Sequence, residues 1–318
     1  MVGQIFQTIE VTAPVILLIA LGMVIRHKEI ITTSGLHEVK RLIVSVALPA
    51  VFFQAFLTMD LDGRFTTLYA LVLVICFALL LLGYLMRRVT PEGPARETIP
   101  FLMTGFEFGM LGISLFGTVW GMENIGIISV IGLPHEFFIW FVFVTVLARN
   151  YGAKKTVSAT IQSFVQSPII VAIFSGIALN IAGLATPISQ ALVGRAILRT
   201  FELTGAIVGP LILFVIGHGL RVRWSTLRAA APVILVRGTL MVTLALVLGP
   251  LLTGLLDLPP LFEPALFTFL ILPPPFVIPL YIPEGYAKDS EHATVVLSGY
   301  TLFSVIAFVT YVTLSAPL

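Results

Sequence analysis

Two long apolar segments of this chain, 101–119 and 264–282, are each interrupted near the middle by residues that do not suit a continuous helix. The interrupting residues are Gly105, Glu107, Gly109 and Gly112 in the first segment and Pro273, Pro274 and Pro275 in the second. Glycine permits unwinding, and consecutive prolines remove backbone donors and clash with the preceding turn. We therefore expect non-helical stretches around 107–112 and 273–275 that lie close together. Backbone freed within a membrane must be buried in protein or line a cavity. Paired interruptions of this kind point to a transporter's binding site.

Glu107 is the residue in these segments with the clearest chemical capacity. A carboxylate inside a membrane span is costly and usually faces a cavity, where it binds a cation or relays a proton. The alternative is a structural hydrogen bond to the broken backbone of 264–282. The sequence leaves both roles open.

Other polar residues in apolar spans have weaker claims. Glu136, beside His135, suits either a proton relay or a hydrogen-bonded structural pair. Gln54 and Asn180 suit either a substrate path or hydrogen bonds between helices. For Arg237, within an apolar run, we expect a side chain that extends towards the membrane interface.

Composition predicts a polytopic membrane protein. Of 318 residues, 58% are hydrophobic and only 11% are charged, too few to cover a water-facing surface. A net charge of +2 argues against a nucleic-acid partner. The sequence has no His-Glu-x-x-His, Gly-x-Ser-x-Gly or phosphate-binding loop, and no Cys/His ligand cluster, so an enzyme is not expected.

Hydropathy predicts ten membrane spans, because about twenty apolar residues are needed for each helical crossing. Lysine and arginine gather in the odd-numbered connections, which places those connections in the cytoplasm and both termini outside. The predicted membrane is a plasma or inner membrane. The spans are 5–25, 42–58, 65–86, 98–119, 125–148, 168–182, 201–220, 229–255, 264–282 and 293–314.

The two halves of the chain show weak self-similarity. Ten spans divide into two sets of five, and an odd number requires the second set to be inverted. The matching pairs are Pro14 with Pro168, Gly22 with Gly176, Pro49 with Pro210, Gly109 with Pro274, and Gly132 with Gly299. The ordered matches predict two five-helix inverted repeats, residues 1–155 and 156–318.

Several motifs resemble those of the auxin efflux carrier (PIN-like) family. They are the Ala-Pro-Val-Ile-Leu-Leu-Ile-Ala-Leu-Gly run at 13–22 with its following basic cluster, 44–53, 167–170, 209–217 and 286–289. The resemblance implies an all-α fold of ten transmembrane helices, in which broken fourth and ninth helices cross. It also implies transport of small organic anions such as auxin or dicarboxylates. The chain departs from the family in placing Glu107 where an Asn is common and Ser114 where a Pro is common.

We therefore expect a secondary transporter of small organic acids that works by elevator-type alternating access. Spans 1, 2, 6 and 7 would form a scaffold and spans 3–5 and 8–10 the moving unit, as the resemblance implies. No cofactor is expected, although H⁺ or Na⁺ is a candidate coupling ion. The expected partners are a small-molecule substrate, membrane lipid and a second copy in a homodimer. The alternatives are a ligand sensor with a transporter fold and a sodium-coupled protein like the bile-acid symporters.

Overall fold

The structure, a computed structural model, describes residues 2–59, 63, 65–152, 162, 165–220 and 224–315, and side chains are not described at 2–12, 33 and 224–229. The predicted boundary between residues 155 and 156 lies outside these ranges. Every regular element in the described ranges is helical. The α-helices are α1 (Val2–His27), α2 (Thr33–Leu42), α3 (Leu48–Thr58), α4 (Phe65–Val89), α5 (Pro94–Leu102), α6 (Ile113–Trp120), α7 (Ile125–Phe138), α8 (Val144–Asn150), α10 (Pro168–Ile181), α11 (Ala185–Gln190), α12 (Leu192–Ala206), α13 (Val208–Gly219), α14 (Trp224–Leu255), α15 (Phe262–Leu270) and α16 (Ala287–Ser315).

Short π- and 3₁₀-helical segments join or extend several of these helices. The π-helical segments are η1 (Ile43–Ala47), η2 (Phe108–Gly112) and η4 (Ile139–Phe143), and the 3₁₀ segments are η3 (Met122–Asn124), η5 (Ile278–Tyr281) and η6 (Glu284–Tyr286). Because η1 connects α2 directly to α3, the second predicted span is one long helix with a wider turn inside it.

Six of the helices in the described part of the chain are long and apolar enough to cross a membrane. They are Ser34–Thr58, Phe65–Val89, Met122–Asn150, Leu192–Gly219, Ala230–Leu255 and Glu284–Ser315. These lengths and compositions indicate an integral membrane protein. The other four predicted spans coincide with α1, of which Ala13–His27 has described side chains, with the shorter helix Pro168–Ile181 and with the two interrupted segments. The predicted seventh span, 201–220, corresponds to α12 and α13. It begins at Leu192, nine residues before the predicted start, and its first half is mainly exposed.

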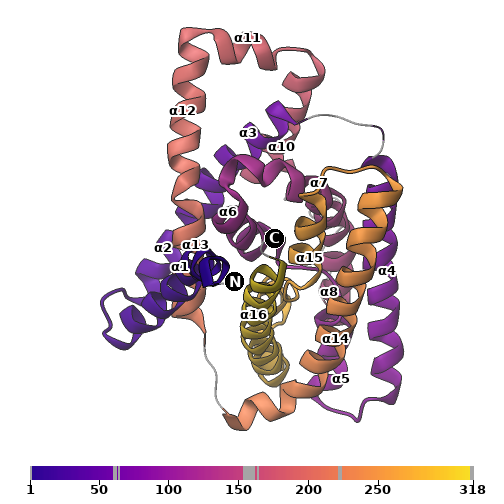
Figure 1. Cartoon of the computed structure of the whole chain (residues 1–318). Helices are drawn as coiled ribbons and strands as arrows, with labels where there is room; N and C mark the ends of the chain where they lie inside the picture. The colour runs from indigo at the N-terminus through magenta and orange to yellow at the C-terminus, as the bar shows by residue number, and fades with distance from the viewer. Residues whose placement is uncertain are drawn as a thin grey trace.

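Two helix pairs form one side of the molecule: α1 packs along α13, and α10 packs along α3 (Figure 1). Both contacts depend on a glycine. A Cβ atom at Gly22 of α1 would collide with the carbonyl oxygen of Phe214, and one at Gly176 of α10 would lie 2.7 Å from that of Phe53. The absence of a side chain therefore lets each pair of backbones approach closely.

A second group contains α4, α5, α7, α8, α14, α15 and α16, and in it α14 packs on α15 and α16, and α4 packs on α5 and α7 (Figure 1). Polar contacts join four of its elements at one end. Arg87 on α4 forms a 2.6 Å ion pair with Glu97 on α5. Tyr151, just after α8, donates a 3.1 Å hydrogen bond to Asp289 on α16. Burial, followed by the charge of Asp289, raises the pKa of Tyr151, so the phenol keeps the proton that it donates.

The interrupted segments follow α5 and α15, which belong to the second group, and give that group a non-helical interior. In the first, α5 ends at Leu102 and residues 103–107 are not helical, after which η2 and α6 continue the chain. In the second, residues 271–277 after α15 are not helical, and this stretch includes the three prolines. The prediction of an unwound stretch at 273–275 is confirmed. The prediction that 107–112 is unwound is wrong beyond Glu107, because residues 108–112 form a π-helical turn.

Candidate functional site

The two interruptions are hydrogen-bonded to each other through Glu107. The backbone N–H of Glu107 donates to the carbonyl oxygen of Pro273 at 2.8 Å. Its carboxylate oxygen Oε2 accepts a 2.6 Å hydrogen bond from the backbone N–H of Phe276. The peptide groups that the broken helices release therefore find partners in one another, as buried backbone requires.

The prolines decide which backbone donor meets the carboxylate. Pro273, Pro274 and Pro275 carry no N–H, so Phe276 provides the first backbone donor after Leu272. The three proline rings are buried, whereas Glu107 and Phe276 are partly exposed. Glu107 and Phe276 thus lie at the less buried edge of an otherwise closed junction.

Arg237 of α14 holds the two interruptions from the other side. Its Nη1 donates to Leu102 O at 3.2 Å, and its Nη2 donates to Gly105 O at 2.5 Å and to Leu272 O at 3.3 Å. Leu102 ends α5, and Leu272 lies two residues after α15, so the negative ends of two helices share one cation. The expectation that Arg237 extends to the interface is wrong: its side chain is fully buried (0% exposed), because these carbonyls replace water around the guanidinium.

Aromatic rings complete the surroundings of this cation. The Arg237 guanidinium carbon lies 5.2 Å from the ring centre of Phe106 and 5.2 Å from that of Tyr300. A planar guanidinium between two rings gains cation–π attraction while its N–H groups remain free for the carbonyls. Nε has no hydrogen-bond partner. Arg237 is a fixed structural cation whose Nη atoms are already committed to backbone.

His135 of α7 supports the first interruption. Its Nε2 accepts a 2.9 Å hydrogen bond from the backbone N–H of Phe106, the residue before Glu107. An accepting Nε2 carries no proton, so the neutral ring has its proton on Nδ1. Nδ1 lies 3.5 Å from Oε1 of Glu136, whose Oε2 accepts from Trp140 at 3.2 Å. Glu136 therefore lies beside the interruption and reaches it through His135.

The predicted glycines differ in what they contact. Gly105 has φ of +71°, a conformation that side chains rarely adopt, and a Cβ atom there would lie 2.9 Å from the ring of Pro275. A Cβ atom at Gly112 would lie 2.9 Å from the side chain of Leu272. A Cβ atom at Gly109 would have no heavy atom within 4 Å, so there is open space beside Gly109.

Asn180 and Gln54 lie on the packed helix pair α10 and α3. Asn180 of α10 donates from Nδ2 to Phe56 O at 3.0 Å and to Met59 O at 2.6 Å, which satisfies carbonyls at the end of α3. Gln54 is partly buried on α3, and its carbonyl oxygen accepts from Thr58. The structure thus brings together Glu107, the three glycines and the three prolines, and gives Asn180 a capping contact instead.

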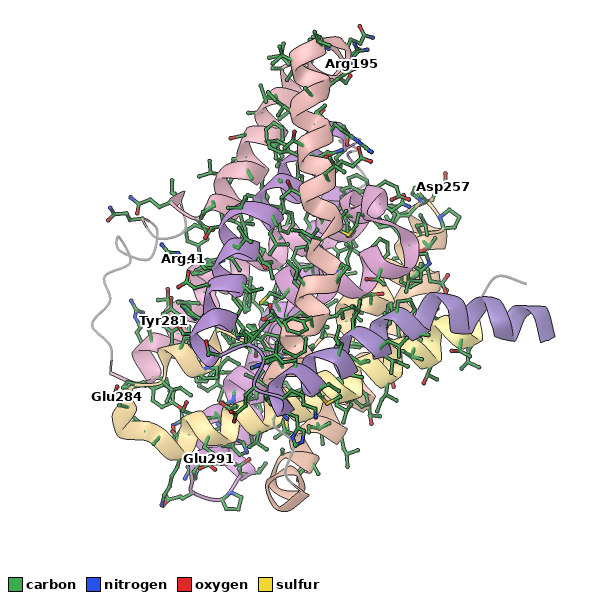
Figure 2. All side chains as sticks on the ribbon, turned by 90° about the vertical axis from the view of Figure 1, so that its left-hand side faces the viewer. Arg41, Arg195, Asp257, Tyr281, Glu284 and Glu291 are labelled. Atoms are coloured by element: carbon green, nitrogen blue, oxygen red, sulfur yellow. The ribbon has the colours of Figure 1, made fainter. Side chains whose placement is uncertain are left out.

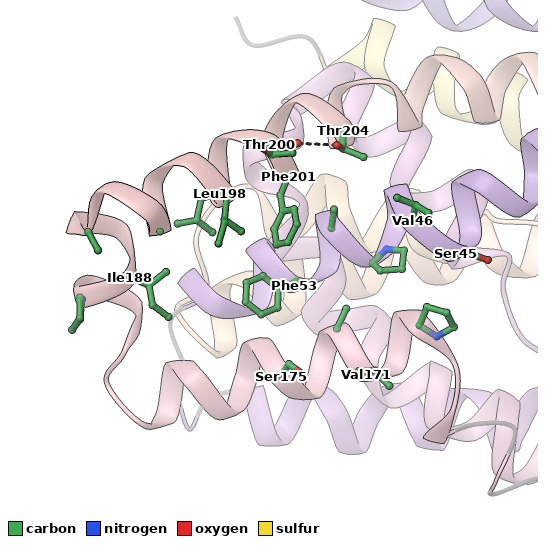
Figure 3. A pocket seen from close by; sticks show the side chains of 18 residues that line it. Ser45, Val46, Phe53, Val171, Ser175, Ile188, Leu198, Thr200, Phe201 and Thr204 are labelled. Carbon is green, nitrogen blue, oxygen red and sulfur yellow. Dashed lines mark hydrogen bonds between the residues drawn. The ribbon is translucent and has the colours of Figure 1, made fainter.

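An open apolar groove of about 940 Å³ lies elsewhere, between α3, α10, α11 and α12 (Figure 3). Phe53 and Phe201 meet edge to face within it, with ring centres 5.5 Å apart. None of the predicted site residues lines this groove. Its apolar walls suit contact with hydrocarbon.

Sequence reasoning missed the roles of Arg237, His135 and the Phe276 N–H. A lone arginine inside an apolar span is a signal in itself, since such charges usually face the bundle interior. The N–H of Phe276 follows from the proline run, because it is the first donor that the run leaves. No residue pattern indicates that Ser304 of α16 donates to Ile271 O at 2.6 Å.

Comparison with models of known protein families gives no match, and neither does comparison with curated proteins. The function of this chain is therefore inferred from its own residues and contacts.

Proposed function

We propose that this protein is a secondary transporter of small organic acids, similar in plan to the auxin efflux carriers, with its substrate site at the junction of the two interrupted helices. The observation that carries the proposal is the pair of contacts that join Glu107 to Pro273 and Phe276. Two helices broken at the same place, with unwound backbone and a carboxylate at a partly exposed edge, are typical of transporter sites. Continuous helices would serve a structural bundle equally well.

The proposed inverted repeat has support from equivalent contacts in the two halves. Gly22 meets Phe214 and the backbone nitrogen of His218, whereas Gly176 meets Phe53 and the backbone nitrogen of Leu57. Gly22 and Gly176 are 154 residues apart, and both Phe53 to Phe214 and Leu57 to His218 are 161 apart. A symmetry operation that exchanges the two halves therefore converts the contact of Gly22 into the contact of Gly176.

Helix ends support the same operation. Arg26 of α1 donates to His218 O at 3.3 Å and to Leu220 O, at the end of α13. Asn180 of α10 likewise donates hydrogen bonds to carbonyl oxygens at the end of α3. Arg26 and Asn180 are again 154 residues apart, and Met59 and Leu220 are 161 apart. This agreement favours two repeats of five spans, with ten spans in total.

Residues of the odd- and even-numbered connections lie at different sides of the molecule, as the proposed orientation requires. In Figure 2, Arg41 lies at the left and Glu284 and Glu291 at the lower left, whereas Arg195 lies at the top and Asp257 at the upper right. The first set belongs to connections that we propose to be cytoplasmic, and the second to connections on the opposite side. The end of α1 that begins at Val2 and the end of α16 at Ser315 lie on one side (Figures 1 and 2).

The test is flux through the full-length protein in proteoliposomes. Labelled mono- and dicarboxylates should enter by counterflow, and a pH gradient should drive net uptake. The variant Glu107→Gln should lose pH-driven uptake and keep exchange, because the amide cannot carry a proton. The control Glu123→Gln changes an exposed carboxylate in η3 and should leave both activities intact.

Three results would change the proposal. Saturable binding without counterflow would indicate a sensor. Uptake that requires sodium at every pH would favour a sodium-coupled transporter. Unchanged pH-driven uptake in Glu107→Gln would make the carboxylate structural.

A further inference from the structure

Glu107 already occupies the backbone donor that a substrate carboxylate would need. The Phe276 N–H is the first donor after the prolines, and Glu107 Oε2 accepts from it at 2.6 Å. The same carboxylate chemistry is what an organic acid brings. Ligand and side chain are therefore equivalent competitors for one hydrogen bond.

The surroundings provide room for such an exchange. Glu107, Gly109, Met110, Phe276 and Val277 are all partly exposed, while the residues on either side of them are mainly buried. There is also open space beside Gly109, two residues after Glu107. A ligand with an apolar body would meet Met110, Phe276 and Val277 at this edge.

The charges near Glu107 do not balance a second anion. Arg237 directs its Nη atoms at three carbonyl oxygens on the buried side. Lys40 of α2 and Glu136 of α7 act on Glu107 electrostatically with opposite signs. Among the helices packed against η2, α6 has no titratable side chain, α13 has His218 and α15 has Glu263.

Two ionised carboxylates at one donor would repel each other strongly. At about 4 Å and an effective dielectric constant near 20, the repulsion lowers affinity by roughly a thousandfold. A proton on Glu107 removes this repulsion and turns one of its oxygens into a donor for the substrate carboxylate. Loaded and empty sites then carry the same net charge.

We propose that the Glu107 carboxylate occupies the position of a substrate monocarboxylate while the site is empty. The substrate anion displaces Glu107 as the acceptor of the Phe276 N–H, and the released side chain binds one proton from solvent. The inference rests on the proposed transport function and specifies its substrate class and coupling ion. The substrate would replace one side-chain carboxylate that binds one proton, so a monocarboxylate with an apolar body is favoured over a dicarboxylate. Proton and substrate must then enter together.

Proton uptake on ligand binding tests this directly. The purified full-length protein in weakly buffered detergent solution is titrated with acetate, hexanoate and benzoate while an indicator dye reports pH. Saturable binding of hexanoate or benzoate should take up about one proton per ligand when the site is ionised, and the dissociation constant should rise about tenfold per pH unit. Benzamide and benzylamine are the neutral and cationic controls.

Matched variants locate the proton. Glu107→Gln should bind benzoate without proton uptake, because its amide oxygen can still be displaced from Phe276 N–H but cannot be protonated. Glu136→Gln should keep the uptake of about one proton. An infrared difference spectrum should show a new carboxylic-acid carbonyl band in the wild-type protein and in Glu136→Gln, so the test stands even where Glu107→Gln does not fold.

Each contrary result identifies what fails. Benzoate binding without proton uptake, or uptake abolished by Glu136→Gln, overturns the role of Glu107 while counterflow can still uphold the proposed transport function. Binding of benzylamine with proton release would show a cation site at Glu107. Absence of saturable binding for every monocarboxylate, together with absent counterflow, overturns both proposals.

Discussion

Three buried polar side chains serve the peptide groups that the two interruptions release. Arg237 donates to three carbonyl oxygens, His135 accepts from Phe106 N–H, and Ser304 donates to Ile271 O. An unpaired buried peptide group costs about 1–3 kcal/mol, so the interruptions persist only while these partners remain. Glu107 differs from them because it is partly exposed and its partner is an N–H that a ligand can also use.

The contact of His135 gives a prediction for stability. His135→Gln can keep an acceptor for Phe106 N–H, whereas His135→Phe keeps a ring of similar shape and has none. We expect His135→Phe to lower the free energy of unfolding by about 1–3 kcal/mol and His135→Gln to lower it by less. Thermal unfolding of both purified variants in the same detergent measures the difference. A larger loss in His135→Gln than in His135→Phe would show that the packing of the ring against Phe106 and Phe269 matters more than the hydrogen bond.

At the level of helices, the sequence predicted where the chain would be helical better than it predicted the shape of the interruptions. Apolar run length located the spans, since a membrane helix must satisfy its own backbone. The prolines predicted the interruption at 273–275 because they have no backbone N–H to donate a helical hydrogen bond. Glycines were ambiguous: Gly105 adopts a positive φ, whereas Gly109 and Gly112 lie in a π-helical turn. Asn180 was predicted at the site because local sequence does not tell which helix end a polar side chain will cap.

The paired glycines give a prediction for helix packing. In Gly22→Ala and Gly176→Ala, the new Cβ would press on backbone of α13 and α3 respectively, and backbone cannot turn away as a side chain can. Both variants should lose stability, by about 1–3 kcal/mol, through overpacking. Gly254→Ala on α14 is the control, because no heavy atom lies within 4 Å of its Cβ position and alanine favours helix. A loss at only one of the two glycines would contradict the equivalence of the halves.

At the scale of the molecule, contacts divide most of the helices into two bodies, which meet between α6 and α13, between α1 and α16, and between α3 and α7. One body contains the pairs α1 with α13 and α3 with α10. In the other, α4, α5, α8 and α16 are linked at one end through Arg87, Glu97, Tyr151 and Asp289. The bodies meet where Ser114 of α6 donates to Gly209 O at 2.9 Å. Alternating access requires that contacts of this last kind change while contacts inside each body persist.

Disulfide cross-links would test this division. The variants are built on Cys76→Ala, which removes the buried cysteine. Thr118→Cys with Gly209→Cys joins the two bodies, since a Cβ atom at Gly209 would lie 3.2 Å from Thr118 Oγ1.

The control pair joins helices of one body: Val51→Cys with Gly205→Cys, where a Cβ atom at Gly205 would lie 2.8 Å from Val51 Cγ2. Oxidation of the Thr118–Gly209 pair should stop counterflow in proteoliposomes, because a fixed contact between the bodies prevents their relative movement, and reduction should restore it. The Val51–Gly205 cross-link should leave counterflow unchanged. Undiminished flux through the cross-linked Thr118–Gly209 protein would mean that the two bodies do not slide past each other, and would confine any gating movement to the interruptions themselves.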